Sequence, residues 1–260
     1  MVTTLGRSVL NLVKYLGDLA LLAWDTAVSV VVSKLRVTLF VRQVFEVGWR
    51  SQLVVIVTGM FTGAVLTAQT YFQFSKLGMK SAVGAVVVIS LFRELGPVLT
   101  GLMVSGRVGA SFAAEIGTMK VTEQIDALRS LGVHPTDYLV VPRVLALLIS
   151  MPLLVAESVG LGIVASYFVG TQMLGISAPY YVTNMLHYAG SRDIKMALVK
   201  GFAFAIVIAF VSCYEGLNAK EGAVGVGRAP TEAIVICSLA ILVSNFFLTF
   251  ALNILFPYGS

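Results

Sequence analysis

The sequence predicts an all-α integral membrane protein, with an N-terminal amphipathic helix in the membrane interface, five spanning helices and a short cytoplasmic helix between spans two and three. Of the 260 residues, 58% are hydrophobic and 12% charged, whereas a soluble domain carries about 25% charged residues. Five apolar stretches are long enough to cross the bilayer, which takes roughly 20 helical residues. The alternation typical of barrel strands is weak. We expect one domain, 1–260, with an interfacial region at 1–48 and the spans within 49–260.

The first 48 residues mix charges into apolar sequence, unlike a cleavable leader with its single short apolar core. Apolar residues recur at helical spacing, while Arg7, Lys14 and Asp18 fall on other faces of the same helix; the apolar positions are Leu5, Val9, Leu12, Leu16 and Leu19. This pattern predicts a helix lying in the interface. Asp25 argues against a full crossing, and the alternative is that part of 19–33 enters the bilayer more deeply.

The five spans are expected at 51–75, 82–106, 139–170, 198–217 and 233–256. Lysine and arginine concentrate before residue 51 and in the connection after span two, and cytoplasmic loops carry such an excess. We therefore expect a cytoplasmic N-terminus, cytoplasmic loops at 107–137 and 218–232, and a C-terminus on the other side. The polar, tyrosine-containing stretch 172–191 predicts a short helix at the non-cytoplasmic headgroups.

Span two holds the most informative feature, because Arg93 and Glu94 stand side by side in its middle. Ionisable groups at membrane depth are costly and usually face a bundle interior, a cavity or one another. Gly96 and Pro97 follow and predict a kink. Neighbouring helical residues point about 100° apart, so the two charges can serve different partners. Lys200 in span four is a second candidate for an anionic headgroup, the alternative being that it snorkels to the interface.

The stretch 115–136 is the most polar connection between spans. Charged and apolar residues interleave there as in a compact amphipathic helix, which Gly132 and Pro135 close. A helix of this kind between two spans is suited to docking a cytoplasmic partner. The alternative is a helix lying passively on the headgroups.

Small residues recur four apart in several spans, as in the Gly59–Gly63 pair. Such faces let helix backbones approach closely in lipid. Packing within one chain is the simpler interpretation, and a seam between two copies is the alternative.

No catalytic motif accompanies the membrane acids. Gly222–Gly227 is glycine-rich but lacks the Gly-Lys-Ser/Thr of a phosphate-binding loop, so we expect a cytoplasmic turn there. Any ATP drive must therefore come from a partner. Cys213 and Cys237 lie in apolar segments and are expected to be reduced core thiols, and scattered basic residues give no sign of a nucleic-acid partner.

The run LFRELGPVLTGLMVSGRVGASFAAEIGTMKVTEQIDAL at 91–128 resembles the signature of the MlaE permeases, the membrane subunits of ABC systems that move phospholipid between the two membranes of Gram-negative bacteria. The resemblance covers nearly the whole chain. It implies a non-catalytic homodimer in the bacterial inner membrane. An MlaF-type ATPase, which binds the ATP and magnesium, would dock on a coupling helix at about 115–128. The coupling residues would be Glu115, Met119, Lys120, Glu123, Gln124, Asp126 and Leu128.

The resemblance also implies an MlaB-type STAS protein on the ATPase and a periplasmic MlaD-type MCE hexamer. A phospholipid cavity between the permease subunits would be lined by Arg93, Glu94 and Lys200, with a span-one wall of Leu66, Gln69, Thr70 and Phe72. Apolar walls with a few cations suit a lipid phosphate. Two other functions remain open: a passive lipid-binding scaffold that anchors MCE proteins, and an intramembrane enzyme, which the missing nucleophile and base disfavour.

Overall fold

The computed structural model describes residues 2–32, 36–220 and 222–256, without the side chains of 2–5, 8 and 223. The predicted contribution of Leu5 to an apolar stripe and the position of the last four residues lie outside this description. Every element described is a helix. The first half of the chain contains α1 (Val2–Val32), α2 (Val37–Val44), η1 (Phe45–Trp49), α3 (Arg50–Lys76), η2 (Lys80–Ala82), α4 (Val83–Ser90), η3 (Leu91–Leu95), α5 (Gly96–Val104), η4 (Ser105–Gly109) and α6 (Ala110–Val121). The second half contains α7 (Gln124–Ser130), η5 (Thr136–Val140), α8 (Val141–Phe168), η6 (Val169–Met173), α9 (Ala178–Tyr188), α10 (Ser191–Leu217) and α11 (Gly222–Leu255).

The five predicted spans are confirmed as α3, the α4–α6 run, α8, α10 and α11. The second is longer than expected, because its helical path continues from Val83 through two π-turns to Val121. Within the described residues a sixth stretch, Val9–Val32 of α1, also has the length and composition to cross a membrane. The protein is therefore a multi-pass membrane protein.

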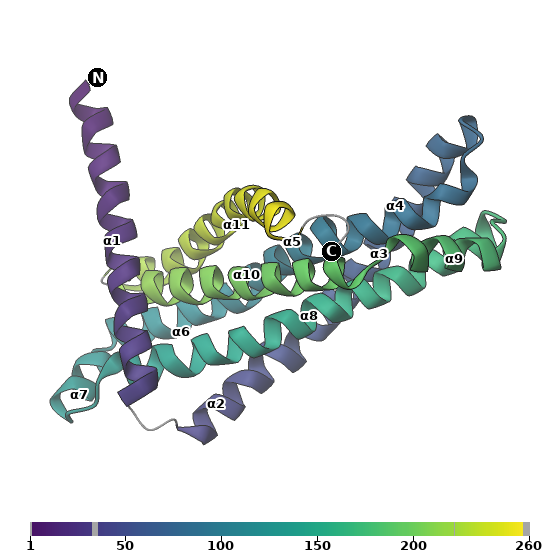
Figure 1. Ribbon diagram of the computed structural model, residues 1–260. Coiled ribbons are helices and arrows are strands. Elements are labelled where there is room, and N and C mark those ends of the chain that lie inside the picture. The colour runs from purple at the N-terminus through teal and green to yellow at the C-terminus, as the bar shows by residue number, and fades with distance from the viewer. Residues whose placement is uncertain (1, 33–35, 221, 257–260) are drawn as a thin grey trace.

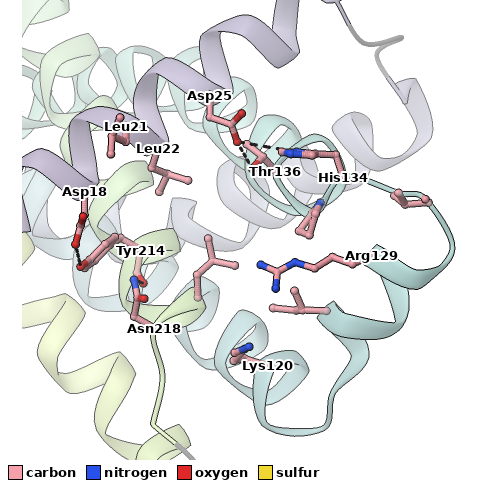
Figure 2. A pocket seen from close by; sticks show the side chains of 15 residues that line it. Asp18, Leu21, Leu22, Asp25, Lys120, Arg129, His134, Thr136, Tyr214 and Asn218 are labelled. Atoms are coloured by element: carbon pink, nitrogen blue, oxygen red, sulfur yellow. Dashed lines mark hydrogen bonds and ion pairs between the residues drawn. The ribbon is translucent and has the colours of Figure 1, made fainter.

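Helix α1 does not run along the bundle. Figure 1 shows it crossing one end of α6, α8 and α10, the end that also carries α7. Its second half is held there by hydrogen bonds from the Tyr214 hydroxyl to Asp18 at 3.0 Å and from the Thr136 hydroxyl to Asp25 at 2.6 Å (Figure 2). Along its first half, Val9, Leu12 and Leu16 remain exposed, as expected of a helix that lies in the interface.

Helices α3 and α8 approach backbone to backbone. A Cβ atom at Gly63 would lie 2.1 Å from the carbonyl oxygen of Gly162, and one at Gly59 would lie 2.5 Å from that of Ser158. Because real side chains never come so close, only glycine permits this contact. The small residues of span one therefore pack within the chain, which confirms the simpler interpretation for this pair.

A chain of buried hydroxyl groups joins one end of the contact between α3 and α8 to α9. Thr67 donates to Ser166 at 2.8 Å, and Ser166 lies 2.5 Å from the hydroxyl of Tyr181. All three side chains are fully buried. Burial raises the pKa of Tyr181 above its ordinary value, while the hydrogen bonds from Ser166 and Thr67 oppose this shift. The expected short helix within 172–191 is thus present and anchored.

Two sequence predictions are wrong in their boundaries. The amphipathic helix expected at 115–128 is divided, because residues 115–121 continue α6 and a new helix begins only at Gln124, after Glu123 in the left-handed region at φ 60°. Gly222–Gly227 is not a turn but the first turns of α11. Cys213 and Cys237 are buried free thiols, as predicted.

Candidate functional site

The charged pair of span two lies on a π-turn. The element η3 covers Leu91–Leu95 and ends at Gly96-Pro97. Proline has no amide hydrogen, so Pro97 cannot make the α-helical bond to the carbonyl oxygen of Arg93, four residues earlier. Lys200 of α10 donates to this carbonyl instead, at 2.5 Å. The predicted interruption of span two therefore exposes a main-chain acceptor, and a buried lysine satisfies it.

Arg93 turns towards the start of α10. Its Nε atom donates to Oδ1 of Asp193 at 2.5 Å, and both side chains are largely buried. The other carboxylate oxygen of Asp193 accepts the Gly190 amide at 3.0 Å, which caps α10. Asp193 therefore fixes the orientation of Arg93, and the N-terminus of α10 in turn fixes the orientation of Asp193.

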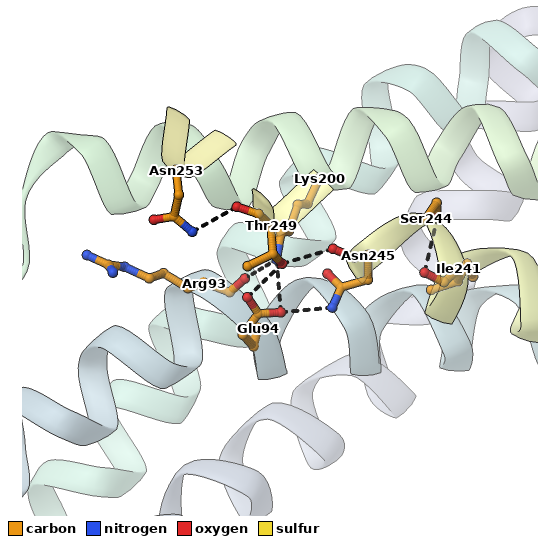
Figure 3. Close-up of polar contacts among 8 residues, drawn as sticks. All are labelled: Arg93, Glu94, Lys200, Ile241, Ser244, Asn245, Thr249 and Asn253. Carbon is orange, nitrogen blue, oxygen red and sulfur yellow. Dashed lines mark hydrogen bonds and ion pairs between the residues drawn. The ribbon is translucent and has the colours of Figure 1, made fainter. Parts of the chain in front are cut away.

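Glu94 turns towards α11 and α10 (Figure 3). Its carboxylate accepts hydrogen bonds from Lys200 at 2.9 Å, from the Asn245 amide at 2.8 Å and from the Thr249 hydroxyl at 2.9 Å. Lys200 also donates to Thr249 at 2.9 Å and is fully buried. Lys200 therefore does not snorkel, and the expectation that the two neighbours of span two serve different partners is confirmed.

The four ionised groups Arg93, Glu94, Asp193 and Lys200, here called the charged cluster, carry no net charge. Buried charges are tolerated when they are paired and hydrogen-bonded. Glu94 retains 38% of its side-chain exposure while Lys200 has none. The cluster is thus accessible from the side of Glu94. A phosphate would reach the fully buried Lys200 only if it displaced the Glu94 carboxylate.

The four span-one residues lie on two faces of α3. Thr70 is buried, and Leu66 is half-buried against the hydrophobic core. Gln69 and Phe72 are exposed on the other side. A common wall made by the four residues stays a prediction.

The seven coupling candidates fall into four groups. Met119 and Leu128 pack against the core, and Glu115 pairs with the buried Arg143 at 2.8 Å. Lys120 and Asp126 form an ion pair at 3.6 Å. Glu123 and Gln124 are exposed at the start of α7. The surface available to a partner is therefore α7 with its preceding turn, together with the exposed side of Glu115.

Asp193, Asn245 and Thr249 belong to the charged cluster or contact it, and sequence reasoning missed all three. Two signals were available. Asp193 precedes Lys200 by seven residues, which is two helical turns and hence the same face. Asn245 and Thr249 stand four apart, with Asn253 four further on, in a span that carries no charge. Such a polar stripe within an apolar helix indicates a face turned towards other polar groups.

Comparison with known proteins agrees with this architecture. The family model described as Permease MlaE matches residues 40–251. A probable ABC transporter permease protein of Rickettsia felis is 44% identical over 246 residues, covering 95% of each chain. A protein of the same description from a Synechocystis strain is 40% identical over 207 residues, 80% of this chain and 79% of the relative. The chain belongs to the MlaE permease family.

Proposed function

We propose that this chain is the non-catalytic permease subunit of an ATP-driven transporter that moves phospholipids between the inner and outer membranes and so maintains outer-membrane lipid asymmetry. The observation that carries the proposal is the charged cluster in the middle of an apolar bundle. Arg93 and Lys200 are each paired with a carboxylate, and ionisable groups within spanning helices are costly and usually mark a substrate or ion pathway.

The chemistry of the cluster suits a phospholipid headgroup. A phosphodiester can replace a carboxylate as the partner of an arginine or a lysine, because both anions accept charge-assisted hydrogen bonds. Arg93 can present a planar donor fork and Lys200 a compact point charge. The span-one residues Leu66, Gln69, Thr70 and Phe72 would line the path of the acyl chains, completed by a second copy in a homodimer.

The remaining parts of the transporter follow from family membership. The named relatives are ABC permeases, so we assign the energy supply to an MlaF-type ATPase that binds ATP and magnesium. It would dock on α7 and the end of α6. An MlaB-type STAS protein would bind the ATPase, and an MlaD-type MCE hexamer would cover the periplasmic end, where α9 lies. The chain would reside in the inner membrane, with a cytoplasmic N-terminus and a periplasmic C-terminus.

The proposed cycle couples the two ends of the bundle. ATP binding moves α7 and α6, closes the dimer cavity and expels lipid towards the MCE pore. Helix α6 continues without a break through η4 into α5 and η3, so movement of the α7 end is transmitted along one helical path to Arg93 and Glu94.

The test is lipid transfer by the reconstituted complex in nanodiscs and the phospholipid that co-purifies with it. The Arg93→Ala/Glu94→Ala variant should lose both about tenfold, whereas the exposed Arg42→Ala should retain them. Normal lipid content and normal transfer by the double variant would reject the proposal.

The passive scaffold is the second candidate, because complete internal pairing of the cations is also what a purely structural cluster would show. Glu123→Lys separates the two, since Glu123 is exposed at the turn before α7. An ATP-driven permease should lose transport while the complex still assembles and still holds lipid. A scaffold should transfer lipid at the original rate.

A further inference from the structure

A cavity lies at the α7 end of the bundle, and no residue of the charged cluster lines it. It measures about 780 Å³, within the range of small-molecule sites. Helix α1, the end of α10, α7 and the loop before η5 line it, and it is open to one side (Figure 2). The 17 residues of α10 between Lys200 and Leu217 make about 25 Å of helix. The cavity is therefore a separate site.

Charges of opposite sign line opposite walls of this cavity. Asp18 and Asp25 come from α1, whereas Lys120 and Arg129 come from the α6–α7 wall. In Figure 2 the guanidinium group of Arg129 points into the space between them. Since the two walls belong to separate elements, an occupant with both a positive and a negative group could bridge them.

Lys120 and Arg129 can each donate hydrogen bonds to a further anionic partner. Arg129 and Lys120 share a single carboxylate, that of Asp126, at 3.2 and 3.6 Å. The longer separation exceeds a direct hydrogen bond. Two cations thus face one carboxylate among these three groups. On the acidic wall, Asp25 and Asp18 accept hydroxyl hydrogen bonds from Thr136 and Tyr214, and the Nδ1 atom of His134 lies 3.9 Å from Asp25. A carboxylate has about four acceptor positions. Each acid can therefore accept further donors.

Part of the remaining lining is apolar. Leu21, Leu22, Ile125, Val133 and Leu217 line the cavity between the charged walls. Helix α1 crosses the end of the bundle (Figure 1), and its exposed apolar side chains indicate a helix in the interface, so we infer that the cavity beneath it lies at headgroup level. An occupant that is polar at one end and apolar at the other fits both features.

We propose that this cavity binds the headgroup of a membrane phospholipid that carries both a phosphodiester and a primary ammonium, with the phosphate on Lys120 and Arg129 and the ammonium on Asp25. The lipid bridges α1 to α7, so it holds the docking helix against the interfacial helix. An anionic headgroup without the amine would satisfy the basic wall only and would face the two acids.

Site-directed photocrosslinking tests the assignment on the full chain in nanodiscs of equal phosphatidylethanolamine and phosphatidylglycerol. Leu21 is replaced by p-benzoylphenylalanine, and Leu10 serves as the matched control because both leucines of α1 are about equally exposed, at 68% and 70%. Leu10 does not line the cavity. Crosslinked lipid is identified by mass spectrometry. At position 21 the amine lipid should exceed the glycerol lipid by about fivefold, as expected for one partly exposed charge-assisted contact.

Substitutions on each wall then locate the two charges. Arg129→Gln and Asp25→Asn should each remove most of the preference at position 21, whereas Lys14→Gln on the exposed part of α1 should not. Equal lipid ratios at positions 21 and 10 would overturn the proposal. So would a preference for phosphatidylglycerol, or equal crosslinking of phosphatidylcholine, whose ammonium donates no hydrogen bond.

Soluble competitors separate a lipid headgroup from a free anion. Phosphoethanolamine should reduce the crosslink at position 21 more strongly than inorganic phosphate at the same concentration. Complete displacement by inorganic phosphate alone would show that the cavity binds a simple anion and would overturn the lipid assignment.

Discussion

Lys200 donates a hydrogen bond to the main-chain carbonyl of Arg93, the carbonyl to which Pro97 cannot donate. One fully buried ammonium group thereby satisfies both a helix defect and the Glu94 carboxylate. The lysine of span four therefore compensates for the proline that interrupts span two, although 103 positions separate Pro97 and Lys200 in the sequence.

Removing Lys200 should destabilise the protein strongly. Lys200→Met leaves Glu94 without its cation and the Arg93 carbonyl without its donor, which should cost about 3–5 kcal/mol of unfolding free energy. Thermal unfolding in detergent measures the loss. Lys195→Met, at an exposed position of the same helix, is the control and should change the melting temperature little.

The link between Lys200 and Pro97 has its own test. Pro97→Ala supplies an amide hydrogen four residues after Arg93, so it should partly rescue Lys200→Met. The double-mutant cycle should be non-additive by about 1 kcal/mol. Simple additivity would mean that the proline and the lysine act independently.

Asp193 should control how firmly a lipid phosphate is held. In Asp193→Asn the carboxylate that competes for Arg93 is gone, so more phospholipid should co-purify, by about threefold for one largely buried charge. Arg93→Ala should change the amount in the opposite direction. Lipid phosphorus per protein is the measurement, with the exposed Glu232→Gln as control. Less lipid in Asp193→Asn than in the unmodified chain would contradict this role.

The backbone contact between α3 and α8 should tolerate no side chain. Gly63→Ala places a methyl group 2.1 Å from the Gly162 carbonyl oxygen, and forcing the helices apart should cost about 1–3 kcal/mol. Gly160→Ala is the matched control on α8, because nothing lies within 4 Å of its added Cβ. Thermal unfolding should separate the two clearly. Equal melting temperatures of the two variants would show that α3 and α8 can move apart at little cost.

Tyr181→Phe should remove the last member of the buried hydroxyl chain and cost about 1–2 kcal/mol, since Ser166 then loses a partner. Tyr180→Phe, at the exposed neighbouring position, should be neutral. Burial raises the pKa of Tyr181, so its stabilising effect is complete below the ordinary tyrosine pKa of about 10 and declines as the pH rises above it. Tyr181→Phe should remove that part of the alkaline loss of stability.

Length and hydropathy were enough to predict the spans, because a bilayer of fixed thickness leaves few other solutions. The divergence of Arg93 and Glu94 followed from helical geometry alone. Their partners did not, since the contact with Asp193 joins segments 100 residues apart. The break in the helix at Glu123 could not be predicted, because the residue that adopts the left-handed conformation is neither glycine nor asparagine.

The small residues of span one show that sequence spacing has the same limit for helix packing. Their spacing indicated a close helix contact but could not identify the partner helix. Only the structure shows that Gly59 and Gly63 meet Ser158 and Gly162. Asn245 and Thr249 were visible as a stripe, and their function becomes clear only when α11 is placed beside η3.

The seam between Gly63 and Gly162 also determines which parts of the molecule can move. Two helices in main-chain contact cannot rotate or slide past one another without collision. We therefore expect α3 and α8 to move as one rigid unit. Helix α11 is packed less closely within this chain, because 17% of its most apolar stretch is buried, against 72% for the stretch that contains α8. Its polar ties to η3 are the Asn245 and Thr249 bonds to Glu94. Any group that displaced Asn245 and Thr249 from Glu94 would therefore loosen the attachment of α11 to η3.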